Sequence, residues 1–170
     1  VVTDIEAYSG GGNTWINEGI WIGGTRVSPQ GRGYNLAVVD PVSGVVERVA
    51  AFDTWENTAE GDRMADFIQE VPVGRIVAGS VRDHGSGGLG VRAKKELRSL
   101  GVRLFPESWG SHSFIGVRGA MGRRIHEGIS LQDNPVAVGV LSPRMPEAST
   151  QDVDAIARFL EKEAGRAPGR

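Results

Sequence analysis

The sequence predicts one α+β (mixed α/β) domain, built from two mostly antiparallel β-sheets packed with two to three helices. Short runs of β-branched and aromatic residues alternate with segments whose apolar residues recur at helical spacing. The 25 glycines cluster between these runs, which is typical of short strands joined by tight turns. An early hairpin argues against a doubly wound parallel sheet. We expect the domain to cover residues 1–163, with 164–170 as a flexible tail or linker.

The first third of the chain predicts mostly strands. Runs rich in β-branched and aromatic residues predict strands at Val1–Tyr8, Thr14–Ile22, Tyr34–Asp40 and Val45–Phe52. The glycines of Ser9–Gly12 predict a turn between the first two strands. Because Pro41 and Gly44 are favoured in tight turns, the last two strands are expected to form a hairpin.

The rest of the chain alternates helices with strands. Met64, Phe67 and Ile68 share one face of a predicted helix, and Pro72 marks its end. The predicted elements are a helix at Glu60–Val71, a strand at Arg75–Val81, a helix at Leu89–Leu100, strands at Ser113–Val117 and Pro135–Leu141, and an amphipathic helix that begins at Ser149 or Thr150.

Composition argues against several classes of function. The formal net charge is -2 and the Lys and Arg residues form no basic stripe, so we expect no nucleic-acid partner. No apolar run approaches the roughly 20 residues of a membrane span, so we expect no membrane insertion. The chain has no cysteine, which excludes disulfides, thiolate nucleophiles and cysteine-bound zinc.

No motif predicts a cofactor or a metal ion. The segment Gly85–Gly90 lies between a predicted strand and a predicted helix, where backbone amides can hold an anion. It lacks the Lys-Ser/Thr ending of a phosphate-binding loop, and a flexible connector is the favoured interpretation. His84, His112 and His126 have no short ligand spacing such as His-x-x-x-His.

Polar and aromatic residues gather at the ends of predicted strands and form the candidate site. They are Asp53 and Trp55 after one strand, Arg82, Asp83 and His84 after another, and Trp109 before a third. A tryptophan face can stack on the C–H face of a pyranose, while carboxylates and planar donors fix its hydroxyl groups. These residues therefore predict a carbohydrate site. The alternative is that Trp55 and Trp109 only pack against the core and that Asp53 only caps its turn.

Two other functions stay open at this stage. A protein-interaction domain would use Trp55 or Trp109 as an interface anchor. A hydrolase would combine Ser111 or Ser113 with His84 or His112 and with Asp53 or Asp83, which requires these groups to converge within hydrogen-bond reach.

Several segments in order resemble the interleukin-like EMT inducer (ILEI, or GG) domain family. They are Ser9–Asn13, Gly31–Gly44, Ala51–Trp55, Phe67–Gly74, Ile76–Asp83, Ala93–Gly101 and Trp109–Gly119. The resemblance implies a β-sandwich-type fold of two sheets packed with helices. It also implies non-catalytic carbohydrate binding, as in the stem domain of a protein O-mannose N-acetylglucosaminyltransferase. Carried over to this chain, the family's sugar site points to Asp53, Arg82 and Asp83, with Trp55 and Trp109 as stacking partners.

We therefore predict a carbohydrate-binding module that is part of a larger surface, secreted or phage-tail protein. Its partner would be a glycan or polysaccharide, with a protein partner as the alternative. The expected location is extracellular or surface-associated, either secreted or on a virion, and the sequence leaves a cytoplasmic location open. The absence of cysteine departs from the disulfide-bonded animal members. The richness in Ala, Gly, Arg and Val indicates a bacterial or phage source.

Overall fold

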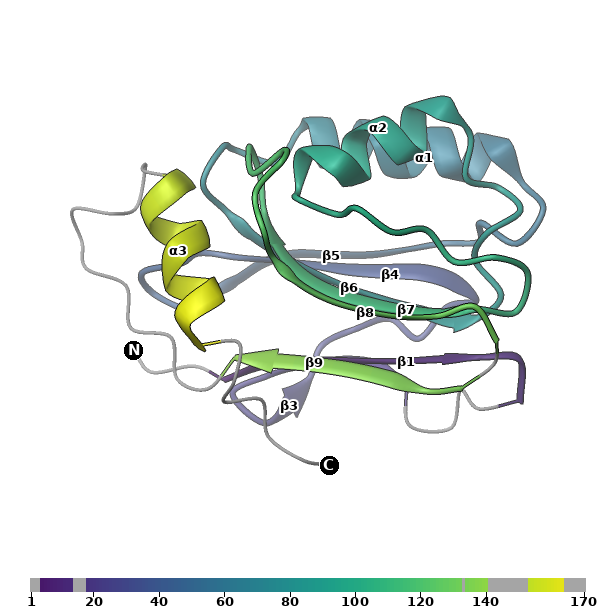
Figure 1. Cartoon of the computed structure of the whole chain (residues 1–170), viewed down its shortest axis with the longest axis horizontal. Helices are drawn as coiled ribbons and strands as arrows, with labels where there is room; N and C mark the ends of the chain where they lie inside the picture. Colours follow the sequence, from purple (N-terminus) through teal and green to yellow (C-terminus); the bar gives the residue numbers. More distant parts are fainter. Residues whose placement is uncertain (1–3, 14–17, 133, 141–152, 164–170) are drawn as a thin grey trace.

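The computed structural model describes residues 4–13, 18–132, 134–140 and 153–163 (Figure 1). The elements are β1 Ile5–Gly11, β2 Gly19–Ile22, β3 Thr25–Arg26, β4 Gly33–Val39, β5 Val46–Phe52, α1 Thr58–Gln69, β6 Ile76–Asp83, α2 Val91–Ser99, β7 Ser111–Val117, β8 His126–Ser130, β9 Val136–Val140 and α3 Val153–Glu163. The predicted α+β class is confirmed. Within these described residues, no helix is long and apolar enough to cross a membrane.

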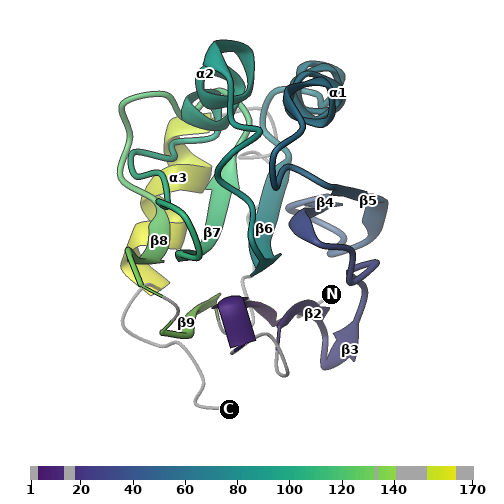
Figure 2. The same ribbon diagram turned by 90° about the vertical axis from the view of Figure 1, so that its right-hand side faces the viewer.

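The strands form a mixed sheet of nine strands that folds into two layers. One layer has the order β5-β4-β6-β7-β8 and the other has the order β3-β2-β1-β9, with antiparallel neighbours throughout. The layers are joined where the ends of β1 and β6 run parallel, at Gly10–Arg82 and Gly11–Asp83. Helices α1 and α2 lie on the outer side of the β6 layer, opposite the β1 layer (Figure 2).

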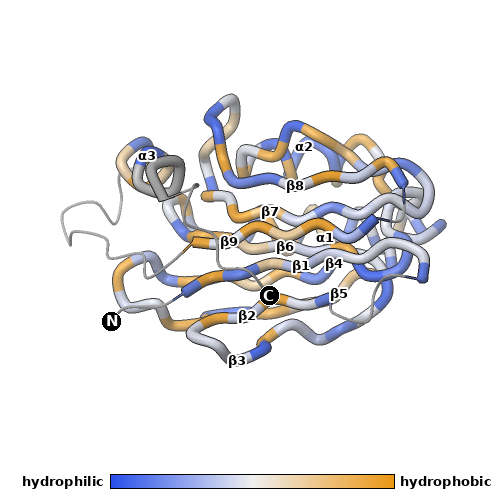
Figure 3. Tube along the Cα trace, turned by 60° about the horizontal axis from the view of Figure 1, so that its bottom comes forward, coloured by the Kyte–Doolittle hydropathy of each residue, from blue (hydrophilic) through white to orange (hydrophobic). Residues whose placement is uncertain are grey.

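Side-chain alternation along the central strand β6 divides the core in two. Val77 and Val81 belong to the cluster that packs against α1 and α2. Ile76 and Ala78 point the other way, into a second cluster with Ile5 of β1 and the apolar residues of β2, β7 and α3. The tube in Figure 3 shows apolar positions recurring along β6 and β7. Both faces of the β6 layer are therefore covered, which explains why its central strands are almost wholly buried.

The predicted hairpin and helices are present, with shifted ends. Asp40 accepts hydrogen bonds from the amides of Val42 and Ser43, which tightens the turn between β4 and β5. The helix predicted from residue 60 begins at Thr58 because the side chain of Asn57 accepts hydrogen bonds from two free amides at its start. Helix α2 runs over Val91–Ser99, inside its predicted range.

The turn predicted at Ser9–Gly12 is wrong over Ser9–Gly11, which continue strand β1. Ser9 Oγ donates to the Val81 carbonyl and accepts from the His112 amide, so a polar side chain is held inside the sheet. Strands β3 and β8 were not predicted, because both are short and largely polar. The predictions for residues 1–3, 14–17, 141 and 164–170, and the start of the last helix at Ser149 or Thr150, lie outside the described residues.

Candidate functional site

The sheet register brings the predicted site residues to one end of the β6 layer. Strands β5 and β6 end there and β4 and β7 begin there, because Tyr34 pairs with Phe52 and Gly33 pairs with Arg82. Strand β1 also ends here, with Gly11 beside Asp83. Segments that are far apart in the sequence therefore meet at a single edge.

Three aromatic side chains form a continuous row along this edge, which we call the aromatic row: Trp55, His84 and Trp109. The ring centroids of Trp55 and His84 lie 6.2 Å apart, and those of His84 and Trp109 lie 4.8 Å apart with an interplanar angle of 33°. Arg32 extends the row, since its guanidinium carbon lies 4.3 Å from the Trp55 ring centroid. Trp109 is 49% exposed, so the row ends in a ring that solvent can reach.

Asp53 is a fixed carboxylate beside the aromatic row. Its two oxygens accept hydrogen bonds of 2.9 and 2.7 Å from Arg32, in a bidentate pair. These bonds hold the pKa of Asp53 below its ordinary value, so the group is charged near neutral pH. The Asp53 amide donates to Glu60 at 3.1 Å, which ties the strand end to helix α1. The exposed carboxylate can still accept further hydrogen bonds from a ligand.

His84 lies in the middle of the row and is only 6% exposed. Burial lowers its pKa, although the charges of Asp83 and Glu56 oppose this shift, so the ring is neutral near pH 7. Its Nε2 lies 3.1 Å from Ser86 Oγ. Its Nδ1 is buried without a hydrogen-bond partner among the described residues. A neutral ring between two indoles is suited to stacking.

Backbone strain gathers at the same edge. Gln30, Asp83 and Trp109 have φ angles of 62°, 63° and 63°, and they are the non-glycine residues with positive φ in the described part of the chain. Arg82 donates a hydrogen bond to the Gln30 carbonyl and so joins two of these segments. Non-glycine residues in this conformation cost about 1–3 kcal/mol each and are typical of functional sites.

The residues of the alternative hydrolase do not converge around either His84 or His112. His112 is fully buried, with Nδ1 2.7 Å from the Tyr34 hydroxyl and Nε2 2.8 Å from Glu127, so Asp53 and Asp83 are not its partners. Ser111 Oγ accepts a hydrogen bond from the Gly11 amide. Neither ring nitrogen of His84 bonds to a carboxylate among the described residues. Its Nε2 lies beside Ser86 Oγ, and its Nδ1 has no hydrogen-bond partner there. Among the described residues, no three His, Asp or Glu side chains are placed to hold a metal ion.

The structure places Asp53, Trp55 and the Arg82–His84 segment at one edge of the sheet and adds Arg32, which was not predicted. The signal was present, because Arg32 stands between Gly31 and Gly33 directly before a strand. Gly33 has φ +89° and no room for a Cβ next to the Phe52 carbonyl, so this strand start must approach β5 closely. That approach places Arg32 against Asp53 and Trp55.

Comparison with known proteins links the chain to one domain family. The family model described as interleukin-like EMT inducer matches residues 32–120. The human protein named cell migration-inducing and hyaluronan-binding protein is 37% identical over 90 residues, which is 52% of this chain and 7% of that protein. Its mouse counterpart is 36% identical over the same shares of each chain. The chain therefore spans only a small part of these relatives' length. Both relatives are mammalian, and the bacterial or phage source stays a prediction.

Proposed function

Because the chain belongs to the interleukin-like EMT inducer family, we propose that it is a non-catalytic carbohydrate-binding domain of a larger secreted or surface-associated protein. The binding surface would be the aromatic row with the polar groups beside it. Asp53 and Asp83 would accept hydrogen bonds from sugar hydroxyls, and Arg82 would donate to ring or carbonyl oxygens. Trp109 would stack on the C–H face of a pyranose, with Trp55 and His84 holding its orientation.

The observation that carries this proposal is the combination of a half-exposed indole with a fixed carboxylate on one rigid edge. Trp109 is supported by His84 at 4.8 Å between ring centroids, and Asp53 is held by Arg32 through two hydrogen bonds. Rigid aromatic and carboxylate groups lose little conformational entropy on binding. The name of the two mammalian relatives also supports a glycan partner, since it includes hyaluronan binding.

The test is a glycan-array screen of the purified chain with Trp109→Ala and Asp53→Ala as site variants. A matched control is Met121→Ala, because Met121 is 60% exposed and follows the opposite end of β7. We expect wild type and the control variant to bind the same glycans, and both site variants to lose binding while their circular dichroism spectra stay unchanged. Absence of wild-type binding across neutral and acidic glycans would refute the proposal.

The second candidate is a protein-interaction domain that uses the same exposed tryptophan. An exposed Trp on a rigid edge is also a common centre of protein interfaces. The two candidates differ in what competes for the surface: a free oligosaccharide displaces a glycan ligand but leaves a protein partner bound. Retention of a glycosidase-treated, deglycosylated partner by wild type and its loss with Trp109→Ala would favour this second function.

A further inference from the structure

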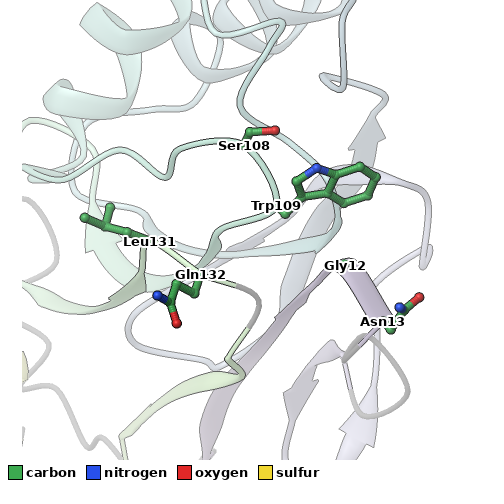
Figure 4. Close-up of a pocket in the computed structure, with 6 residues that line it drawn as sticks. All are labelled: Gly12, Asn13, Ser108, Trp109, Leu131 and Gln132. Atoms are coloured by element: carbon green, nitrogen blue, oxygen red, sulfur yellow. The ribbon is translucent and has the colours of Figure 1, made fainter.

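A pocket lies next to the aromatic row and shares Trp109 with it. It has a volume of about 510 Å³ and is lined by Gly12, Asn13, Ser108, Trp109, Leu131 and Gln132. Figure 4 shows that these residues come from three segments: the chain after β1, the turn before β7 and the chain after β8. The volume falls in the range of about 300–1,000 Å³ that is usual for small-molecule sites.

Among the described residues that line the pocket, Trp109 is the one that also belongs to the aromatic row. His84 contacts the ring from the row, while His84, Asp53 and Arg82 take no part in lining the pocket. The turn before β7 fixes the backbone at Trp109, because the Gly110 amide donates to the Glu107 carbonyl at 2.9 Å and Trp109 takes a φ of 63°. Because the pocket and the row share Trp109, a ligand that contacts the row can extend into the pocket.

The described residues that line the pocket are polar and apolar side chains without charge. Asn13 and Gln132 offer side-chain amides, and Ser108 offers a hydroxyl, all on exposed residues. Within the described part of the chain, neither amide side chain is held by a hydrogen bond to the protein, so donors and acceptors are both available to a ligand. Trp109 and Leu131, which are 49% and 57% exposed, supply apolar surface. Among the described residues that line the pocket, none carries a charged side chain that could pair with a carboxylate or sulfate.

We propose that this pocket is a second subsite that binds an uncharged sugar unit, next to the unit bound at the aromatic row. The inference rests on the proposed carbohydrate function and adds a ligand class to it: a chain of at least two units, with a neutral unit in the pocket. The apolar ring face of that unit contacts Leu131, and its hydroxyl or amide groups bond to Asn13 and Gln132. An acidic unit leaves its charge unpaired here and is disfavoured.

The test measures affinity against chain length by isothermal titration calorimetry. The probes are the one-, two- and four-unit forms of a neutral glucose series, a neutral N-acetylglucosamine series and the acidic hyaluronan series. The variants are Leu131→Ala and Gln132→Ala in the pocket, with Met121→Ala as the control. Both pocket residues are exposed, so these substitutions leave the core intact.

We expect a neutral series to gain about 3- to 10-fold in affinity from one unit to two, as one or two added hydrogen bonds would give. Each pocket variant should lose most of this gain and keep the one-unit affinity. Side-chain amide signals of Asn13 and Gln132 in ¹⁵N NMR spectra should shift with two units and stay unmoved with one. Equal affinity for one and two units, or a gain that survives both substitutions, would overturn the subsite. Failure of wild type to bind any series would instead refute the carbohydrate function itself.

Discussion

Substitution of Trp109 by glycine and by alanine separates binding from stability at the same residue. Both changes remove the indole and therefore its contact with His84, which is worth about 0.5–1.5 kcal/mol for an aromatic pair. Only glycine also removes the cost of a φ of 63°, which is about 1–2 kcal/mol for a residue with a Cβ. The greater freedom of glycine in the unfolded chain opposes this by about 0.4–1 kcal/mol.

We therefore expect Trp109→Gly to be more stable than Trp109→Ala by about 1 kcal/mol, with both variants unable to bind glycan. In a chain of 170 residues this difference raises the Tm by about 2–4 °C. Urea unfolding followed by circular dichroism measures it directly. Trp21 in β2 is the matched control, because it is outside the set of residues with positive φ. At Trp21 the order of stability should reverse: Trp21→Gly should be less stable than Trp21→Ala by about 0.5–1 kcal/mol. Equal stability of the two Trp109 variants would refute the strain argument.

Three further predictions concern buried groups. Burial raises the pKa of Glu18 above 4.5, so the free energy of unfolding falls as pH rises from about 4.5 to the folded pKa. Glu18→Gln should therefore be more stable than wild type at pH 7, with the difference vanishing below about pH 4 in denaturant titrations. Burial lowers the pKa of His84 below 6.5, so wild type should lose stability as pH falls from 7 towards 5, and His84→Gln should show a flatter stability curve over that range. A Cβ on Gly79 would lie 2.3 Å from Phe114, so Gly79→Ala should cost about 1–3 kcal/mol in thermal unfolding, whereas Gly90→Ala, with open space around its Cβ, should cost much less.

Much of the fold could be predicted because its strands carry regular patterns. The hairpin of β4 and β5 follows from β-branched residues on both sides of a Pro-Gly turn, and α1 follows from its apolar spacing. Strand β8, His126–Ser130, could not be predicted, because its polar residues pair only with β7 and lie at the edge of a layer. Its pairing depends on a distant strand, which no local pattern encodes.

The candidate site shows the same division between local and long-range information. Turn residues at strand ends pointed to Asp53 and His84, because polar residues at such ends stand out from the apolar pattern of the strands. Their proximity is a consequence of register, which requires β4 to lie between β5 and β6. The sequence also did not show that β1 reaches the candidate site, again because this depends on a long-range contact. A Cβ on Gly11 would lie 2.0 Å from the Trp109 carbonyl, so this glycine serves close backbone contact within a strand, and not a turn.

The described non-glycine residues with a positive φ angle lie at one edge of the sheet. Gln30, Asp83 and Trp109 adopt a conformation that favours glycine, although the chain uses glycine freely elsewhere and carries 25 of them. Glycine at any of the three would relieve strain, so stability alone does not account for the side chains present. All three border the edge where the aromatic row, Asp53 and the pocket beside Trp109 meet. Strained side chains that gather at one edge of a sheet are typical of functional sites, and they support the binding surface proposed there.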